Sequence, residues 1–120
     1  MIFSLKKFIF SFKNAVRGIK VGFVENNFRL MFFLAVLALI GIAVFPLEKW
    51  EVVVIIFLIG MVFSIELINS QLERILDIVN PLYSEQVRDI KDISAGAVLI
   101  ISLTSLIIAI LIFIPYLLTI

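Results

Sequence analysis

The stretch "EVVVIIFLIGMVFSIELINSQLERILD", from Glu51 to Asp77, decides how this chain folds. Its first part, Val52 to Ile65, contains no charged residue, whereas its second part carries carboxylates at regular intervals. A run of about 20 predominantly apolar residues is long enough to cross a bilayer, and a helix hides its backbone polar groups there. The stretch therefore predicts a membrane-spanning helix whose end becomes polar.

The composition of the whole chain agrees with this prediction. Of the 120 residues, 63% are hydrophobic, and the mean hydropathy is +1.25. Such values are typical of an integral membrane protein, and the length suits a single domain over residues 1–120. The net charge of +1 is not the basic balance of a nucleic-acid-binding protein, so no nucleic-acid partner is expected.

Three segments are long and apolar enough to span a bilayer, with expected bounds of about 28–47, 50–79 and 93–118. Residues 4–24 have a different pattern, because apolar residues fall on one helical face and basic residues on the other. The basic face holds Lys6, Lys13, Arg17 and Lys20. The predicted fold is an all-α membrane protein with an N-terminal amphipathic surface helix and three transmembrane helices.

The distribution of basic residues predicts the orientation. Of the ten Lys and Arg residues, only Lys49 lies in the short "PLEKW" turn between the first two spans, and the others lie on the side of the N-terminus. Because cytoplasmic loops are rich in Lys and Arg, the N-terminus is expected in the cytoplasm. The polar end of the second span lies on the same side, so a site there would face the cytoplasm.

That polar end carries a stripe of oxygen-bearing side chains. At about 100° per residue, one helical face holds Glu66, Asn69, Glu73 and Asp77. Glu66 lies just inside the expected hydrocarbon boundary, where an ionisable group is costly and marks a candidate functional site. The alternatives are that Glu66 pairs with a cation of a neighbouring helix and that the other three residues form a solvated helix end.

The residue types limit the chemistry. The chain has no Cys and no His, which excludes thiol nucleophiles, zinc sites and imidazole catalysis. A bound metal would be a hard, oxygen-ligated ion such as magnesium, and carboxylates beside lysines suit a magnesium-bound polyphosphate. The five glycines form no phosphate-binding loop. The residues alone therefore predict a cytoplasm-facing carboxylate site in a small membrane protein.

The segment "ELINSQLERILDIVNPLYSEQVRDIKDISAGAVLI", from Glu66 to Ile100, resembles the signature of the prokaryotic diacylglycerol kinases and undecaprenol kinases. That signature is E-x-x-N-x-x-x-E-x-x-x-D, followed by K-D-x-x-[AS]-[AG]-A-V-L. In addition, "ENNFR" at residues 25–29 resembles the family's entry into its first span, and "SFKNAVRGIK" at residues 11–20 resembles its surface helix. The resemblance covers nearly the whole chain.

The resemblance implies a homotrimer with active sites between subunits, which transfers the γ-phosphate of magnesium-bound ATP to a lipid hydroxyl. By position, Glu66 resembles the catalytic base, and Glu25 and Glu73 resemble metal ligands that also contact ATP. Asn69 and Asp77 resemble supporting residues. Further implied ATP contacts are Lys7, Asn14, Tyr83, Ser84, Lys91 and Asp92. The implied lipid contacts are Glu66, Arg29 and Ala95.

Two features concern the lipid and the surface helix. Ala95 and Gly96 stand where Gram-negative diacylglycerol kinases tend to have Ser and Ala, and they resemble the Gram-positive undecaprenol kinase branch. Undecaprenol is therefore the favoured substrate, with diacylglycerol as the second candidate, in a multi-pass protein of the bacterial cytoplasmic membrane. The spacing from Gly18 to Glu25 is one residue shorter than the family pattern, which leaves the register of the surface helix open.

Other functional classes fit the sequence less well. A small proton-coupled transporter also uses a membrane-embedded Glu, but it needs that carboxylate near the midplane rather than at one end of a span. A holin or a structural subunit would not explain the aligned stripe together with Lys91 and Asp92. A lipid kinase is the function that the sequence favours.

Overall fold

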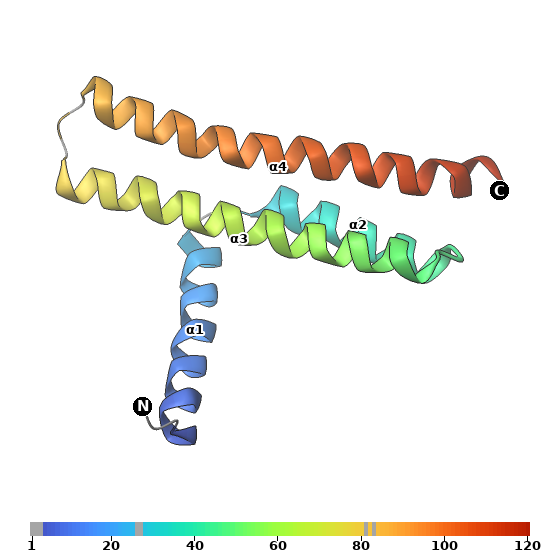
Figure 1. The fold of residues 1–120 in the computed structure, drawn as a ribbon, viewed down its shortest axis with the longest axis horizontal. Helices are drawn as coiled ribbons and strands as arrows, with labels where there is room; N and C mark the ends of the chain where they lie inside the picture. Colours follow the sequence, from blue (N-terminus) through green and yellow to red (C-terminus); the bar gives the residue numbers. More distant parts are fainter. Residues whose placement is uncertain (1–3, 26–27, 81, 83) are drawn as a thin grey trace.

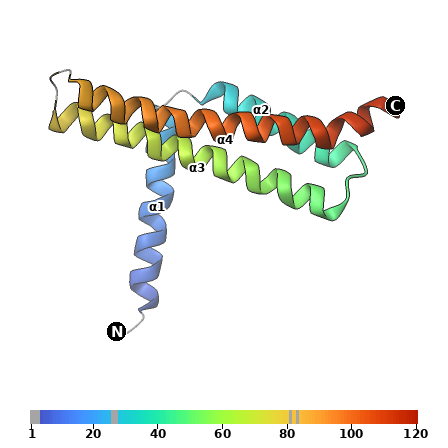
Figure 2. The same cartoon turned by 45° about the horizontal axis from the view of Figure 1, so that its top comes forward.

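The computed structural model describes residues 4–25, 28–80, 82 and 84–120. In this part of the chain the elements are four helices, α1 (Leu5–Glu25), α2 (Arg29–Val44), α3 (Lys49–Val79) and α4 (Glu85–Leu118). Helices α3 and α4 lie antiparallel and side by side, α2 lies along α3, and α1 leaves the other three at a steep angle (Figures 1 and 2). The prediction of an all-α membrane protein is confirmed.

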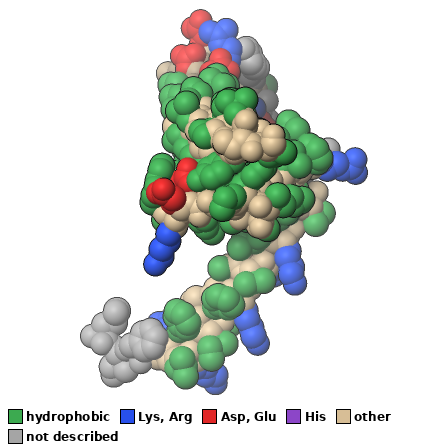
Figure 3. Space-filling model, turned by 90° about the vertical axis from the view of Figure 1, so that its right-hand side faces the viewer, with side chains coloured by type: hydrophobic (Ala, Val, Ile, Leu, Met, Phe, Trp, Pro, Cys, Tyr) green, Lys and Arg blue, Asp and Glu red, His purple; other side chains and the backbone are tan. Residues whose placement is uncertain are grey.

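The helices differ in their ability to cross a membrane. In the described part of the chain, α3 and α4 are each long and apolar enough to do so, and a third span results if α1 and α2 together count as one bent span. The directions of α1 and α2 differ by 113°. Lys and Arg side chains project along one side of α1 (Figure 3). The location of α1 in the membrane surface and the separate span over 28–47 stay predictions.

Helices α3 and α4 are longer than one crossing of a bilayer requires. The 31 residues of α3 extend over about 46 Å, whereas the hydrocarbon core of a bilayer is about 30 Å thick. Helix α4 begins at Glu85, before the expected start of the third span at Ile93, because Ser84 caps it: the Ser84 hydroxyl accepts a hydrogen bond from the Val87 N–H at 3.1 Å. The charged residues 85–92 are therefore helical.

A buried carboxylate, Glu51, joins the start of α3 to the end of α4. Glu51 is only 8% exposed, and its Oε1 accepts hydrogen bonds from the Tyr116 hydroxyl and from the Glu48 N–H, the latter at 2.9 Å. The Glu48 contact satisfies a backbone donor at the start of α3, as in a capping box. The Tyr116 contact joins the end of α4 to the start of α3.

The corner between α1, α2 and α3 is filled by aromatic rings. Ring centroids lie between 5.1 and 6.1 Å apart in a cluster of Phe23, Phe28, Phe32 and Phe63. Next to this cluster, Gly22 of α1 is buried, and a Cβ atom at this position would lie 2.6 Å from Cδ2 of Leu67. The end of α1 therefore packs closely on α3 beside Glu66.

The chain by itself buries little of its apolar surface. Among the described residues, the buried hydrophobic side chains are Phe28, Ile55, Val87 and Ile112, and most other large hydrophobic side chains are exposed. Hydrophobic side chains cover much of the face drawn in Figure 3. In water such a surface would cause aggregation, so lipid or further protein must cover it.

Gly41 permits a close contact between α2 and α4. A Cβ atom there would lie 2.5 Å from Cε1 and 2.8 Å from Cζ of the Phe113 ring, so the ring or the helix would have to shift. We expect Gly41→Ala to lower the free energy of unfolding by roughly 1–3 kcal/mol, measured by thermal unfolding of the purified protein. Gly60→Ala is the matched control, because a Cβ atom at Gly60 meets nothing within 4 Å. Equal unfolding temperatures for both variants would contradict this contact.

Candidate active site

The polar stripe of α3 lies on one face of an uninterrupted helix. Because α3 continues without a break to Val79, the stripe keeps the angular alignment that its spacing predicts. Glu66 and Glu73 are partly buried, Asn69 is buried and Asp77 is exposed. The stripe thus passes from a half-enclosed carboxylate at Glu66 to a water-accessible one at Asp77.

Asn69 connects this stripe to α4. Its side chain is 9% exposed, and its Oδ1 accepts a hydrogen bond of 2.5 Å from the Ser94 hydroxyl. Sequence reasoning did not single out Ser94, although it lies one helical turn after Lys91, so that both residues share a face of α4. The contact fixes α4 against α3 within one turn of Glu66.

Asp77 and Lys91 form a second connection between the two helices. Lys91 Nζ donates to Asp77 Oδ1 at 2.6 Å. Lys91 precedes the apolar part of α4, and this hydrogen bond, helped by the charges of Asp77 and Glu73, raises the pKa of Lys91 above its ordinary 10.5. The contribution of the ion pair is complete below pH 10.5 and is lost only as the pH rises through the higher pKa of the folded state. Lys91 therefore carries a full positive charge at neutral pH.

The carboxylates of Glu66 and Glu73 act on each other electrostatically. The two carboxylates lie on one helix face two turns apart, about 10 Å along the axis; their like charges repel each other, and a bound cation would relieve that repulsion. Among the described residues, no three acidic side chains come together as a complete metal site. Magnesium needs no such cage, since it is commonly held by one or two carboxylates together with water and substrate phosphates. The oxygen donors of the stripe therefore fit a magnesium ion that arrives with a polyphosphate.

Two of the predicted ligands fall outside what the structure describes. Helix α1 ends at Glu25, one turn beyond Gly22, which packs on Leu67. The backbone of Glu25 thus follows directly on the α1–α3 contact, but its side chain and the whole of Tyr83 lie outside the described residues. The metal role of Glu25 and the ATP contact of Tyr83 stay predictions.

Lys7 and Asn14 lie on the exposed surface of α1, far from the stripe. Along the helix axis Lys7 is about 27 Å and Asn14 about 16 Å from the end of α1 at Glu25. Figure 1 shows the start of α1 pointing away from α3 and α4. A single chain therefore does not bring these two residues to the carboxylates, and their contact with ATP stays a prediction.

The other predicted contacts lie at the ends of helices. Ser84 uses its hydroxyl to cap α4, a structural role that sequence reasoning missed although Ser is a preferred residue at that position. Asp92 and Ala95 are exposed on α4, close in sequence to Lys91 and Ser94. Arg29 is the first residue of α2, and its backbone follows Phe28 of the aromatic cluster. The structure does not test the roles of these residues.

The described cluster thus places a half-buried carboxylate, further carboxylates and a charged lysine along one side of α3 and α4. Comparison of the sequence with known proteins identifies its family. Residues 13–113 match the family described as prokaryotic diacylglycerol kinase. The chain belongs to this family.

Two relatives within the prokaryotic diacylglycerol kinase family are similar over most of this chain. An undecaprenol kinase from Bacillus subtilis (strain 168) is 36% identical over 112 residues, covering 92% of this chain and 91% of the relative. A diacylglycerol kinase from Synechocystis sp. (strain PCC 6803) is 32% identical over 111 residues, covering 91% of this chain but 63% of the relative. No solved structure matches the chain at a significant level.

Membership of the prokaryotic diacylglycerol kinase family makes this protein a lipid kinase, a phosphotransferase with an alcohol group as acceptor. The resemblance noted from the sequence is thereby confirmed. Family membership also favours the kinase over the transporter, holin and structural-subunit alternatives. The apolar helices and the family together show an integral membrane protein.

Proposed function

We propose that this protein transfers the γ-phosphate of ATP, in the presence of magnesium, to the hydroxyl of undecaprenol and forms undecaprenyl phosphate. The observation that carries the proposal is the position of Glu66. It is partly buried at the point where the apolar face of α3 gives way to Asn69 and Glu73. A lipid hydroxyl at the headgroup level and a nucleotide phosphate from the aqueous side meet at such a boundary.

In the proposed reaction, Glu66 accepts the proton of the lipid hydroxyl while the hydroxyl oxygen attacks the γ-phosphorus. A new oxygen–phosphorus bond forms, the bond between the γ-phosphorus and the β,γ-bridging oxygen breaks, and ADP leaves. Because such a transition state needs mainly positioning and charge stabilisation, the two connections between α3 and α4 matter: they hold Glu66 in place relative to Lys91.

The carboxylates beside Glu66 have a separate proposed role. Glu25 and Glu73 would hold magnesium, which supplies charge neutralisation of the nucleotide phosphates when bound. Lys91 is charged and exposed enough to contact a phosphate oxygen, and Asp77 orients it through their hydrogen bond. Asn69 supports Glu66 by fixing the distance between the two helices. Asp92, Ser84 and Tyr83 are proposed nucleotide contacts, and Arg29 and Ala95 proposed lipid contacts.

Two further proposals concern the assembly and its orientation. The distribution of Lys and Arg favours a cytoplasmic N-terminus and a cytoplasmic active site. A homotrimer in the bacterial cytoplasmic membrane, as the family resemblance implies, would cover part of the exposed apolar surface. In such an assembly, Lys7 and Asn14 of one subunit would act on the stripe of another, which a single chain does not allow.

Two observations support undecaprenol over diacylglycerol. One is the 36% identity to a relative named undecaprenol kinase, over nearly the full length of both chains. The other is the pair Ala95–Gly96, in which small residues follow Ser94 on α4. Diacylglycerol, which would give phosphatidic acid, is the second candidate because the other relative is named for it.

The proposal is tested with purified protein, radiolabelled ATP and the two lipids side by side in mixed micelles. We expect label in undecaprenol, with kcat/KM at least about tenfold higher than for diacylglycerol, which corresponds to about 1.4 kcal/mol of transition-state preference. Removal of magnesium with a chelator is expected to stop the transfer to either lipid. Preferred labelling of diacylglycerol would overturn the choice of lipid, and no labelling of either would overturn the proposed function.

A further inference from the structure

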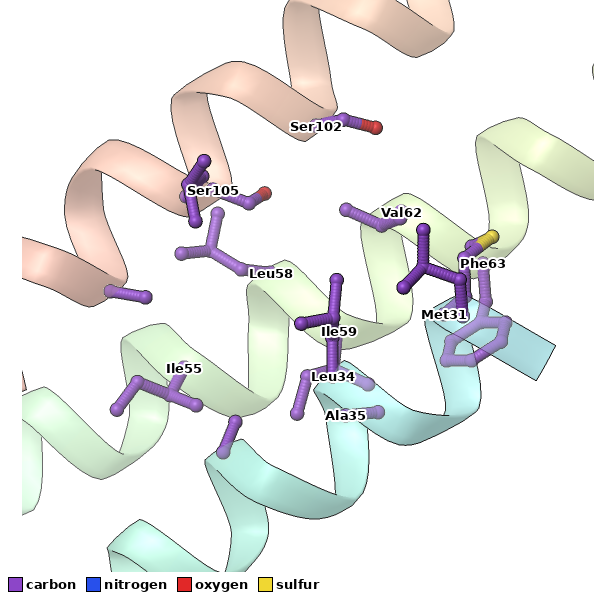
Figure 4. A pocket seen from close by; sticks show the side chains of 14 residues that line it. Met31, Leu34, Ala35, Ile55, Leu58, Ile59, Val62, Phe63, Ser102 and Ser105 are labelled. Atoms are coloured by element: carbon purple, nitrogen blue, oxygen red, sulfur yellow. The ribbon is translucent and has the colours of Figure 1, made fainter. Parts of the chain in front are cut away.

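An apolar groove of about 320 Å³ lies between α2, α3 and α4. Figure 4 shows α3 in the middle of its lining, with α2 and α4 on either side. The side chains that α2 and α4 contribute include several small ones, which leave the space open: Ala35, Ala38, Ser102, Ser105 and Ala109. The lining from α3 consists of larger hydrophobic residues. The groove is thus a furrow whose two sides contain small residues.

The groove is continuous with the candidate active site along α3. Ile55, Ile59 and Val62 all line it, and at about 100° per residue each points within about 40° of the direction of Glu66. Val62 lies one turn before Glu66. One face of α3 is therefore apolar from Ile55 to Val62 and polar from Glu66 to Asp77, with the proposed catalytic base at the junction.

We propose that this groove binds the first part of the hydrocarbon chain of the lipid alcohol, so that the hydroxyl at the head of the chain lies at Glu66. The inference rests on the proposed lipid kinase function and adds the place of the substrate chain. An alcohol with one polar end and one long apolar chain matches the two halves of the α3 face. At about 30 Å³ per water-sized group, the volume holds on the order of ten carbon atoms.

The size of the groove favours one chain over two. A polyprenol is a single chain with one methyl branch on each isoprene unit, whereas diacylglycerol carries two acyl chains that leave the glycerol side by side. Space for on the order of ten carbon atoms accommodates the first isoprene units of one chain. This size favours a single-chain alcohol such as undecaprenol as the occupant.

The groove acts by positioning rather than by hydrophobic attraction. A chain that leaves the bilayer for the groove exchanges one apolar environment for another and gains little from burial. Its gain is the fixed approach of the hydroxyl to Glu66, since a small misplacement of a reacting group costs rate. Ser105 is consistent with this role. Its hydroxyl is buried without a hydrogen-bond partner in the described structure, so the side chain forms no hydrogen bond between helices, and its small size leaves space in the groove.

The test fills the groove from α2. Ala38→Phe places a ring in the furrow, and we expect kcat/KM for undecaprenol to fall about tenfold or more. For an alcohol of one isoprene unit, which is too short to depend on the groove, kcat/KM should stay unchanged, and so should KM for ATP. The matched control is Ala43→Phe, since Ala43 is exposed on the same helix and does not line the groove. Ser105→Leu fills the furrow from the opposite side and should repeat the result.

Several outcomes would overturn the inference. One is an equal loss of kcat/KM for the long and the short alcohol, and another is an unchanged kcat/KM for both alcohols in both groove variants. The third is a changed oligomeric state of Ala38→Phe on size-exclusion chromatography, which would mean that another copy of the chain fills the furrow.

A second measurement does not depend on phosphate transfer. A polyprenol with a photoreactive group on its second isoprene unit is cross-linked to the wild-type protein, and the labelled peptide is identified by mass spectrometry. Label on residues that line the groove, within 30–38, 55–63 or 102–109, supports the proposal, and label confined to other segments contradicts it. If the wild-type protein phosphorylates no lipid, the proposed function fails while this result still decides where the chain binds.

Discussion

Glu66→Gln is expected to lower the rate of lipid phosphorylation by about 10²–10⁴-fold, the usual contribution of a general base. Glutamine keeps the size and the hydrogen-bonding capacity of the side chain but accepts no proton from the lipid hydroxyl. Binding of ATP should change little, since Glu66 is not proposed to contact it. The measurement is the transfer of label from ATP to lipid, with kcat and KM determined for both substrates.

The control for this variant is another carboxylate of the same chain. Glu85 has a side chain that is 86% exposed, at the start of α4, and its contact is a weak ion pair of 3.8 Å with Arg88. Glu85→Gln should therefore keep wild-type activity. Both variants should elute from a sizing column as the wild type does. Near-normal lipid phosphorylation by Glu66→Gln would refute the assignment of the base.

Glu73→Gln is expected to raise the magnesium concentration needed for half-maximal activity by about 10–100-fold, the usual cost of weakening a metal site. The variant keeps the helix and removes one of the two charges that repel each other along α3. Saturating magnesium should restore part of the activity, because the nucleotide phosphates still bind the ion. This partial recovery distinguishes loss of a metal ligand from loss of the base.

Asp89→Asn is the matched control for the magnesium titration. The Asp89 side chain is 65% exposed, and its contact with Arg88 is 4.0 Å long, so removal of its charge should leave the titration unchanged. An unchanged magnesium titration in Glu73→Gln would count against a ligand role for Glu73. A shift of equal size in both variants would show a general effect of surface charge instead.

The sequence by itself was sufficient for the helical class, the family and the polar stripe. These features depend on short-range periodicity and composition: a helix that ends in water must become polar, and the spacing of Glu66, Asn69, Glu73 and Asp77 fixes their common face whatever surrounds them. The boundaries of α3 agree with the predicted second span to within one residue. Helix α4 begins at Glu85, ahead of the expected span of about 93–118, because Ser84 caps the helix there.

Only the tertiary structure decided which residues meet across helices. The pairs Asn69–Ser94, Asp77–Lys91 and Glu51–Tyr116 depend on the register between two antiparallel helices, and no periodicity within one helix encodes that register. The close approach at Gly22 and the groove between α2, α3 and α4 depend on side-chain volumes from several helices at once. A stripe is a property of one helix and can be read locally, whereas a contact or a cavity exists only once the helices have packed.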